Sequence, residues 1–258
     1  MFTPSEIELF NQKKYENEYS LEQLSINPNL DRNNYFHKLV QIKLGLIQKY
    51  GLGKNVLDVG CGAGDYLLQS KNVVSSAVGI DYTQKAITEA LRRRNQHEAM
   101  HLDFRVENAR QMSFSEATFD LAYAFSSLYY MPKVQEVVAQ MVRVLRPKGV
   151  AIFEMGNTYS LNTIVCNAYP ELPQSCHIST GRMAEMIRKA SLRVLSWRAF
   201  QILPMWGEKP AWLRIFLGSR CKKILERNSG SIMLDEKICS VPVMRAFAFR
   251  HIIICQKV

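Results

Sequence analysis

Three glycines, at positions 60, 62 and 64, form the segment of this chain that is best suited to binding a ligand. They lie in the run Val56-Leu57-Asp58-Val59-Gly60-Cys61-Gly62-Ala63-Gly64-Asp65-Tyr66, where an apolar strand leads into a turn that opens a helix. Glycine lets the backbone approach a ligand closely, and the helix start offers unpaired N–H groups. A nicotinamide fingerprint would need glycine at position 65, which is Asp65, and no Gly-Lys-Ser/Thr of a P-loop nucleotidase is present.

Two acidic residues flank this turn along the chain. Asp58 precedes Gly60 by two residues, and Asp81 follows Gly60 by 21 residues at the tip of the next apolar run. A carboxylate beside the glycine turn would repel a pyrophosphate but could bind an ammonium or sulfonium group. An acid after the second strand is typical of residues that bind ribose hydroxyls. The pattern therefore predicts a site for a nucleoside with a positively charged amino-acid tail.

Alternating strands and helices must position these residues. Strands are predicted at Asn55 to Val59, Ala77 to Ile80, Phe119 to Phe125 and Val150 to Phe153. Helices are predicted at 33–48, after a capping Thr83, and from Val134 to Leu145, the last one stopped by Pro147 and Gly149. This order predicts an α/β protein with a doubly wound, mostly parallel sheet.

The last third of the chain departs from the alternation. A helix from Thr180 to Ser191 leads into a strand from Arg193 to Ile202, and a final strand is expected from Phe247 to Cys255, so the two form an antiparallel pair. Residues 155–179 and 203–244 are insertions expected to form the acceptor pocket or a lid. The whole chain, 1–258, is predicted to be a single domain with an N-terminal cap at 1–32, which contains Tyr15 and Tyr19.

The ordered motifs VLDVGCGAGDY, GIDYT, FRVENARQMSF, FDLAYAFSSLYY and VLRPKGVAIFE resemble those of class I S-adenosylmethionine-dependent methyltransferases. The resemblance covers residues 35–202 and the last strand. It implies a Rossmann-like seven-stranded sheet with an antiparallel C-terminal strand, S-adenosyl-L-methionine as cofactor, and methyl transfer to an oxygen, nitrogen or carbon nucleophile of a small molecule. It also implies a set of cofactor-binding residues: Asp58, Gly60, Cys61, Gly62, Gly64, Asp81, Tyr82, Asn108, Ala109, Phe125 and Ser126.

Candidate catalytic residues are less distinct. Many small-molecule members of this family carry a pair of histidines where Tyr129 and Tyr130 stand here. A base is needed if the acceptor is a hydroxyl or an ammonium group, and His177, Tyr129, Tyr130 and Glu154 are the candidates. Each also has a structural interpretation, as a loop histidine or a core or lid aromatic.

The net charge of +10 is concentrated in residues 193–258, which hold 12 Lys or Arg and 4 Asp or Glu. Such a block favours anionic partners, so the expected acceptor is a small molecule, either anionic or lipid-like. An RNA or protein methyltransferase and a cofactor-binding scaffold are the alternatives, with nucleic acid the less favoured partner. The segment Trp206 to Arg227 combines tryptophans, leucines and cations, which indicates a lid or a helix in peripheral contact with a membrane.

Composition excludes several other classes. With 47% hydrophobic residues and no long apolar run, the chain has no transmembrane segment, and no signal peptide is evident. The six cysteines form no CxxC pair, so no metal site is expected and the thiols are taken as reduced. A cytoplasmic location is the expectation.

Overall fold

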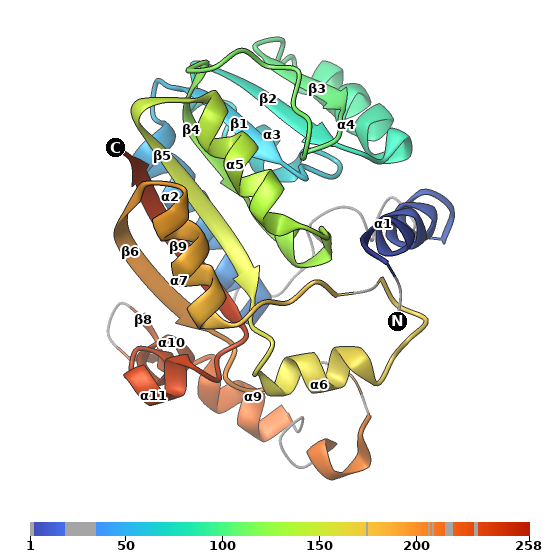
Figure 1. Cartoon of the computed structure of the whole chain (residues 1–258), viewed down its shortest axis with the longest axis vertical. Helices are drawn as coiled ribbons and strands as arrows, with labels where there is room; N and C mark the ends of the chain where they lie inside the picture. Colours follow the sequence, from blue (N-terminus) through green and yellow to red (C-terminus); the bar gives the residue numbers. More distant parts are fainter. Residues whose placement is uncertain are drawn as a thin grey trace.

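The computed structural model describes residues 3–18, 35–173, 175–205, 207, 209–214, 219–229 and 232–258. Within them the main sheet has seven strands in the order β3-β2-β1-β4-β5-β9-β6 (Figure 1). β9 is antiparallel to both of its neighbours, β5 and β6, and the other pairs are parallel. The predicted fold class is confirmed. The strands are β1 (Asn55–Val59), β2 (Ser76–Asp81), β3 (Leu102–Val106), β4 (Phe119–Ala124), β5 (Leu145–Gly156), β6 (Leu192–Phe200) and β9 (Arg250–Lys257).

Helices cover both faces of the sheet, because the strands between them bury side chains on both sides. On β1, Val56 packs in the core beneath α2, whereas Leu57 and Val59 pack in the core beneath α5 and α7. The helices are α1 (Pro4–Lys13), η1 (Lys14–Glu18), α2 (Tyr35–Gly51), α3 (Asp65–Gln69), α4 (Gln84–Gln96), η2 (Leu128–Tyr130), α5 (Val134–Val144), α6 (Leu161–Asn167) and α7 (Thr180–Lys189).

β3 is a strand that its sequence pattern does not predict. α5 ends at Val144, one residue before the predicted Leu145, but β5 begins there and not at the predicted Val150, so Pro147 and Gly149 lie inside the strand. The pairing of β5 with β4 is irregular between Phe119 and Leu121, where the ladder skips from Leu145 to Val150. Proline is accepted there because no ladder hydrogen bond is required of it.

The two insertions have their own secondary structure. Residues 155–179 contain α6, and residues 203–244 contain η3 (Ala211–Leu213), α9 (Ser219–Leu225), β7 (Asn228–Ser229), β8 (Ile232–Met233), α10 (Leu234–Cys239) and the start of α11 (Pro242–Arg245). Together with α6, these elements occupy one end of the molecule (Figure 1). Tyr19, Trp206 and residues 215–217 lie outside the described residues.

Candidate functional site

A cavity of about 400 Å³ opens at the carboxyl ends of β1, β2 and β4. This is the edge of a doubly wound sheet at which ligands bind. Eleven of the residues expected from the sequence line it: Gly60, Cys61, Gly62, Asp81, Tyr82, Asn108, Ala109, Phe125, Ser126, Tyr129 and Tyr130. Asp58, Gly64 and His177 are not among the lining residues.

Glycine is required in this turn because of close contacts and because of positive φ angles. Gly60, Gly62 and Gly64 have φ values of 74°, 53° and 80°. A Cβ on Gly60 would lie 2.4 Å from Ser127 Cβ, and one on Gly64 would lie 2.7 Å from the ring of Phe104. Gly60 and Gly62 therefore bring bare backbone to the cavity, whereas Gly64 serves the packing behind it.

Asp81 is fixed at the cavity by two backbone donors. Gly62 N–H donates to its Oδ2 at 3.0 Å and Thr83 N–H donates to its Oδ1 at 2.9 Å. Burial raises the pKa of Asp81, and the two N–H groups partly offset this shift. Thr83 occupies the N-cap position of α4, as expected, but its side chain makes no cap hydrogen bond. Instead Glu16, from the N-terminal segment, accepts from Lys85 N–H at the start of α4, at 3.1 Å.

Asp58 is buried directly before the glycine turn, next to the hydroxyl of Tyr123, its register neighbour on β4. Neither Asp58 Oδ2 nor the Tyr123 hydroxyl makes a hydrogen bond of ordinary geometry, although the two side chains interact. Burial raises the pKa of Asp58 well above its usual range, and the Tyr123 hydroxyl opposes this shift. A buried carboxylate with imperfect partners is stabilised by a cationic group nearby. The glycine turn and Asp81 at the cavity, with Asp58 two residues before the turn, fit a cofactor with an ammonium and a sulfonium group.

The N-terminal segment closes one side of the cavity. Glu8, Asn11 and Tyr15 line it. Asn11 Nδ2 donates to Tyr130 O at 3.0 Å, and the Tyr15 ring lies 5.9 Å from that of Tyr130. Glu8 forms an ion pair with Arg110. The described part of the predicted cap is thus tied to the site largely by polar contacts.

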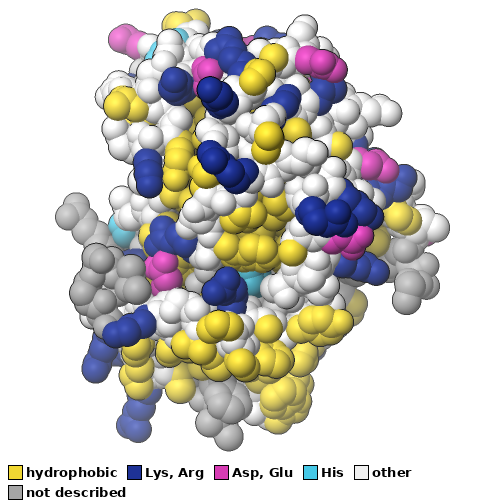
Figure 2. All heavy atoms as spheres, turned by 60° about the vertical axis from the view of Figure 1, so that its left-hand side comes forward, with side chains coloured by type: hydrophobic (Ala, Val, Ile, Leu, Met, Phe, Trp, Pro, Cys, Tyr) yellow, Lys and Arg dark blue, Asp and Glu magenta, His cyan; other side chains and the backbone are white. Residues whose placement is uncertain are grey.

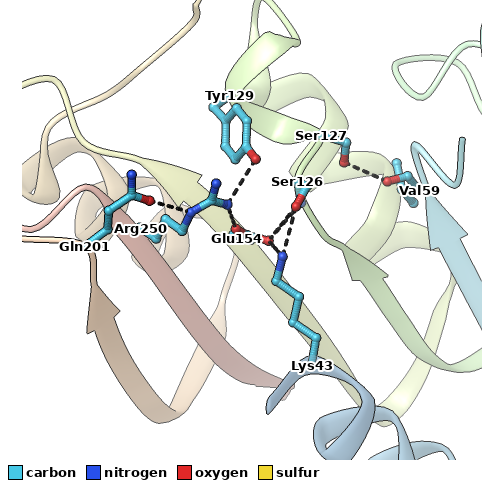
Figure 3. Close-up of polar contacts among 8 residues, drawn as sticks. All are labelled: Lys43, Val59, Ser126, Ser127, Tyr129, Glu154, Gln201 and Arg250. Atoms are coloured by element: carbon cyan, nitrogen blue, oxygen red, sulfur yellow. Dashed lines mark hydrogen bonds and ion pairs between the residues drawn. The ribbon is translucent and has the colours of Figure 1, made fainter. Parts of the chain in front are cut away.

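A buried charge network adjoins the cavity at Ser126 and Tyr129 (Figure 3). Glu154 on β5 forms ion pairs with Lys43 of α2, at 2.6 Å, and with Arg250 at the start of β9. It also accepts from Ser126 N–H at 2.8 Å. Arg250 Nη1 donates to Tyr129 Oη at 3.1 Å. Two cations thus pair with one carboxylate, so the network has a net positive charge.

This network argues against Glu154 and Tyr129 as bases. Burial alone would raise the pKa of Glu154, but the ion pairs with Lys43 and Arg250 outweigh it and lower the pKa to about 2. Burial raises the pKa of Tyr129 although Arg250 opposes the shift. At neutral pH, Glu154 is therefore a paired carboxylate and Tyr129 a neutral phenol.

His177 lies behind Tyr129 as seen from the cavity. Its ring centroid is 6.2 Å from that of Tyr129 and 5.0 Å from that of Phe249. Its Nδ1 lies 2.8 Å from Thr163 Oγ1, and its Nε2 makes no hydrogen bond to a described residue. Burial, with a smaller effect from Arg250, lowers the pKa of His177 to about 4, so the imidazole is neutral at pH 7.

The described part of the chain contains no group of three or more His, Cys, Asp or Glu placed to hold a metal ion. None of its helices is both long enough and apolar enough to cross a membrane. The cytoplasmic location stays a prediction.

Comparison with known proteins identifies the family. Residues 52–213 match a family described as a methyltransferase domain, and the chain belongs to it. The class I fold is shared with a geranyl diphosphate C-methyltransferase from Streptomyces coelicolor A3(2), solved with S-adenosyl-L-homocysteine. The TM-score is 0.59 at 16% identity, over 86% of this chain and 80% of that one.

Curated relatives are similar over part of their length. The chain is 31% identical to O-methyltransferase resE of Aspergillus sclerotiorum over 150 residues, which are 56% of this chain and 57% of that protein. It is 30% identical to phthiotriol/phenolphthiotriol dimycocerosates methyltransferase 1 of Mycobacterium ulcerans (strain Agy99), over 51% of this chain and 46% of that one. The chain thus spans about half the length of these relatives.

Proposed function

We propose that this protein binds S-adenosylmethionine in the cavity and methylates a small molecule. The proposal depends chiefly on one observation: the backbone of Gly60 and Gly62 and the carboxylate of Asp81 meet at a single cavity. Asp81 would accept hydrogen bonds from the ribose hydroxyls, and Asn108 would accept one from the adenine amino group. Bound S-adenosylmethionine would supply a methyl group on a sulfonium centre, whose carbon–sulfur bond breaks as the acceptor forms its new bond.

Calorimetric titration with S-adenosylhomocysteine tests the cofactor site. We expect binding to the wild-type protein, and an Asp81→Ala variant should lose at least about tenfold in affinity, because charge-assisted hydrogen bonds contribute about 1.5–3 kcal/mol. Asp103→Ala is the matched control, since Asp103 lies on the neighbouring strand β3, is 41% exposed and pairs with Arg105. Failure of the folded wild-type protein to bind would contradict the proposal and favour the scaffold function.

The buried network supports an acceptor that becomes anionic. Arg250 Nη1 and Nε are engaged by Glu154, Tyr129 and Gln201, whereas Nη2 makes no hydrogen bond to a described residue. The side chain of Arg250 is 13% exposed but does not line the cavity, so an acceptor would approach it past Tyr129, which does. A hydroxyl that loses its proton near this guanidinium would be stabilised as an oxyanion. We therefore favour oxygen as the methylated atom, as in the relative named an O-methyltransferase.

His177 is the base that fits this acceptor. When the Thr163 hydroxyl donates to Asn157 O, 2.7 Å away, His177 Nδ1–H is the donor in the contact between His177 and Thr163. Its Nε2 then carries a lone pair. This atom lies against Gly156 of β5 and outside the cavity lining, so it would accept the hydroxyl proton only when Tyr129 moves aside. Tyr129 would position both groups, because it contacts the His177 ring and the Arg250 guanidinium. Tyr130 would shape the acceptor side of the cavity.

A further inference from the structure

Exposed apolar side chains gather at the end of the molecule formed by α6, α9 and α11. Seven of the fourteen large apolar side chains that the described residues expose lie there: Tyr159, Ile164, Trp212, Ile224, Val241, Val243 and Phe247. Figure 2 shows hydrophobic side chains as a continuous band at this lower end of the molecule. Patches of this kind mark interaction surfaces.

Hydrogen bonds join the two segments that carry the centre of this surface. Asn157 Nδ2 donates to Ala246 O at 2.7 Å and to Ala248 O at 3.0 Å, on either side of Phe247. The Asn157 Oδ1 in turn accepts from Tyr159 N–H at 3.1 Å. The loop before α6 and the turn after α11 are thus held together as one surface, which we call the apolar end face.

The acids of α10 and the described cations of residues 209–237 differ in exposure, whereas Glu171, after α6, is exposed. Both acids of α10 point inward: Asp235 is fully buried and accepts from Tyr35 and Gln201, and Glu236 pairs with Arg198. The described cations of residues 209–237 are all exposed: Lys209, Arg214, Arg220, Lys223, Arg227 and Lys237. Figure 2 shows Lys and Arg side chains beside the hydrophobic band.

We infer that the apolar end face docks on the surface of a bilayer that contains anionic lipids. Apolar side chains flanked by cations bind such surfaces by burying carbon in the headgroup region while Lys and Arg meet the phosphates. α6 and α11 are short helices, so each can lie in the headgroup region but is too short to cross the bilayer. The face also carries no exposed acid on α10 that the lipid charge would repel.

The apolar end face is connected to the wall of the cavity through residues 155–179. Residues 155–179 contribute Tyr159 and Ile164 to the apolar end face, and the same segment donates Cys176 N–H to Tyr129 O at 2.7 Å. Tyr129 lines the cavity. One insertion therefore connects the lipid-facing surface with the wall of the site.

Co-sedimentation of the full chain with vesicles tests this inference without any acceptor. Vesicles of phosphatidylcholine alone are compared with vesicles in which about a third of the lipid is phosphatidylserine. We expect binding only to the anionic vesicles, weakened by added salt. Val243→Asp should reduce the partition coefficient at least about tenfold, since it replaces an apolar side chain that enters the lipid by a repelled charge.

Met100→Asp is the matched control, because Met100 is 67% exposed and Val243 is 68% exposed. Met100 lies between α4 and β3, at the other end of the molecule (Figure 1). Equal sedimentation of the two variants, or binding that does not depend on phosphatidylserine, would overturn the inference. So would concentration-dependent dimerisation abolished by Val243→Asp, since the face would then bind a second copy of this chain. S-adenosylhomocysteine binding measured on the same samples separates these outcomes from failure of the proposed function.

Discussion

At the scale of single residues, the protonation state of His177 decides whether it can act as a base. The contact with Thr163 leaves the Nε2 lone pair available, and burial keeps the ring neutral. We expect two-dimensional nitrogen–proton NMR to report an Nδ1–H tautomer with a pKa of about 4. The resonance is assigned by its loss in His177→Asn. An Nε2–H tautomer, or a pKa near the usual 6.5, would contradict this role.

Substitution of His177 should also separate catalysis from cofactor binding. Once an acceptor is known, His177→Asn should lower kcat by about 10²-fold or more, in line with loss of a general base. Affinity for S-adenosylhomocysteine should remain, since His177 does not line the cavity. His101→Asn is the control, because His101 is exposed, does not line the cavity, and its ring bonds to Lys71 O. Equal kcat values for the two variants would remove His177 from the mechanism.

The cofactor residues could be predicted from sequence because they are close together along the chain. Gly60, Gly62 and Asp81 lie within one strand–turn–helix–strand unit, so spacing alone brings them together. Lys43, Glu154 and Arg250 come from three distant elements, and only the fold makes them neighbours. The sequence does indicate that Lys43 is buried, because it stands four residues from Leu39 and from Ile47, on the apolar face of its helix.

At the scale of elements, a glycine with positive φ should tolerate substitution by alanine only where the added Cβ has space. Gly64 and Gly53 both have positive φ, 80° and 65°, but a Cβ on Gly53 would meet nothing within 4 Å. Gly53→Ala should therefore cost only about 1–2 kcal/mol of backbone strain. Gly64→Ala adds a clash with Phe104 and should cost about 1–3 kcal/mol more. Urea unfolding measures both, and equal losses would show that the ring moves aside freely.

Elements with a clear apolar period were predicted, and those defined by tertiary pairing were not. β3 alternates buried Leu102 and Phe104 with polar Asp103 and Arg105 over five residues, too short a pattern to distinguish from a loop. It is a strand because it pairs with β2 at the sheet edge. The end of α5 agrees with the prediction to one residue, but the start of β5 was predicted at Val150 and lies at Leu145. Pro147 normally ends a helix or a strand, and here an irregular ladder accommodates it.

At the scale of the whole molecule, the antiparallel end of the sheet depends on a buried neutral histidine. His251 on β9 is fully buried, its Nδ1 accepts from Trp197 Nε1–H of β6 at 2.9 Å, and its Nε2–H donates to Ala248 O at 3.1 Å. Indole can only donate, so a protonated ring would lose this bond. Burial is the main cause that lowers the pKa of His251 to about 4.

Stability should therefore fall in mild acid. The unfolded chain binds the proton of His251 near pH 6.5 and the folded chain only near pH 4, so its contribution is complete above pH 6.5 and is lost as the pH falls toward 4. The loss amounts to at most about 3 kcal/mol. Glu154, with a pKa of about 2, loses its own contribution only below about pH 4.5. Urea unfolding at pH 7 and pH 5 measures the difference.

His251→Asn isolates this effect, because an amide oxygen can still accept from Trp197 but does not titrate in this range. The raised pKa values of the buried acids Asp58 and Asp81 act in the opposite direction, and the lowered pKa of His177 acts in the same direction. These three shifts are common to both proteins. We expect the variant to be less stable at pH 7 but to lose less stability between pH 7 and pH 5 than the wild type. If both proteins lose the same free energy of unfolding, the acid sensitivity of the fold comes from groups other than His251.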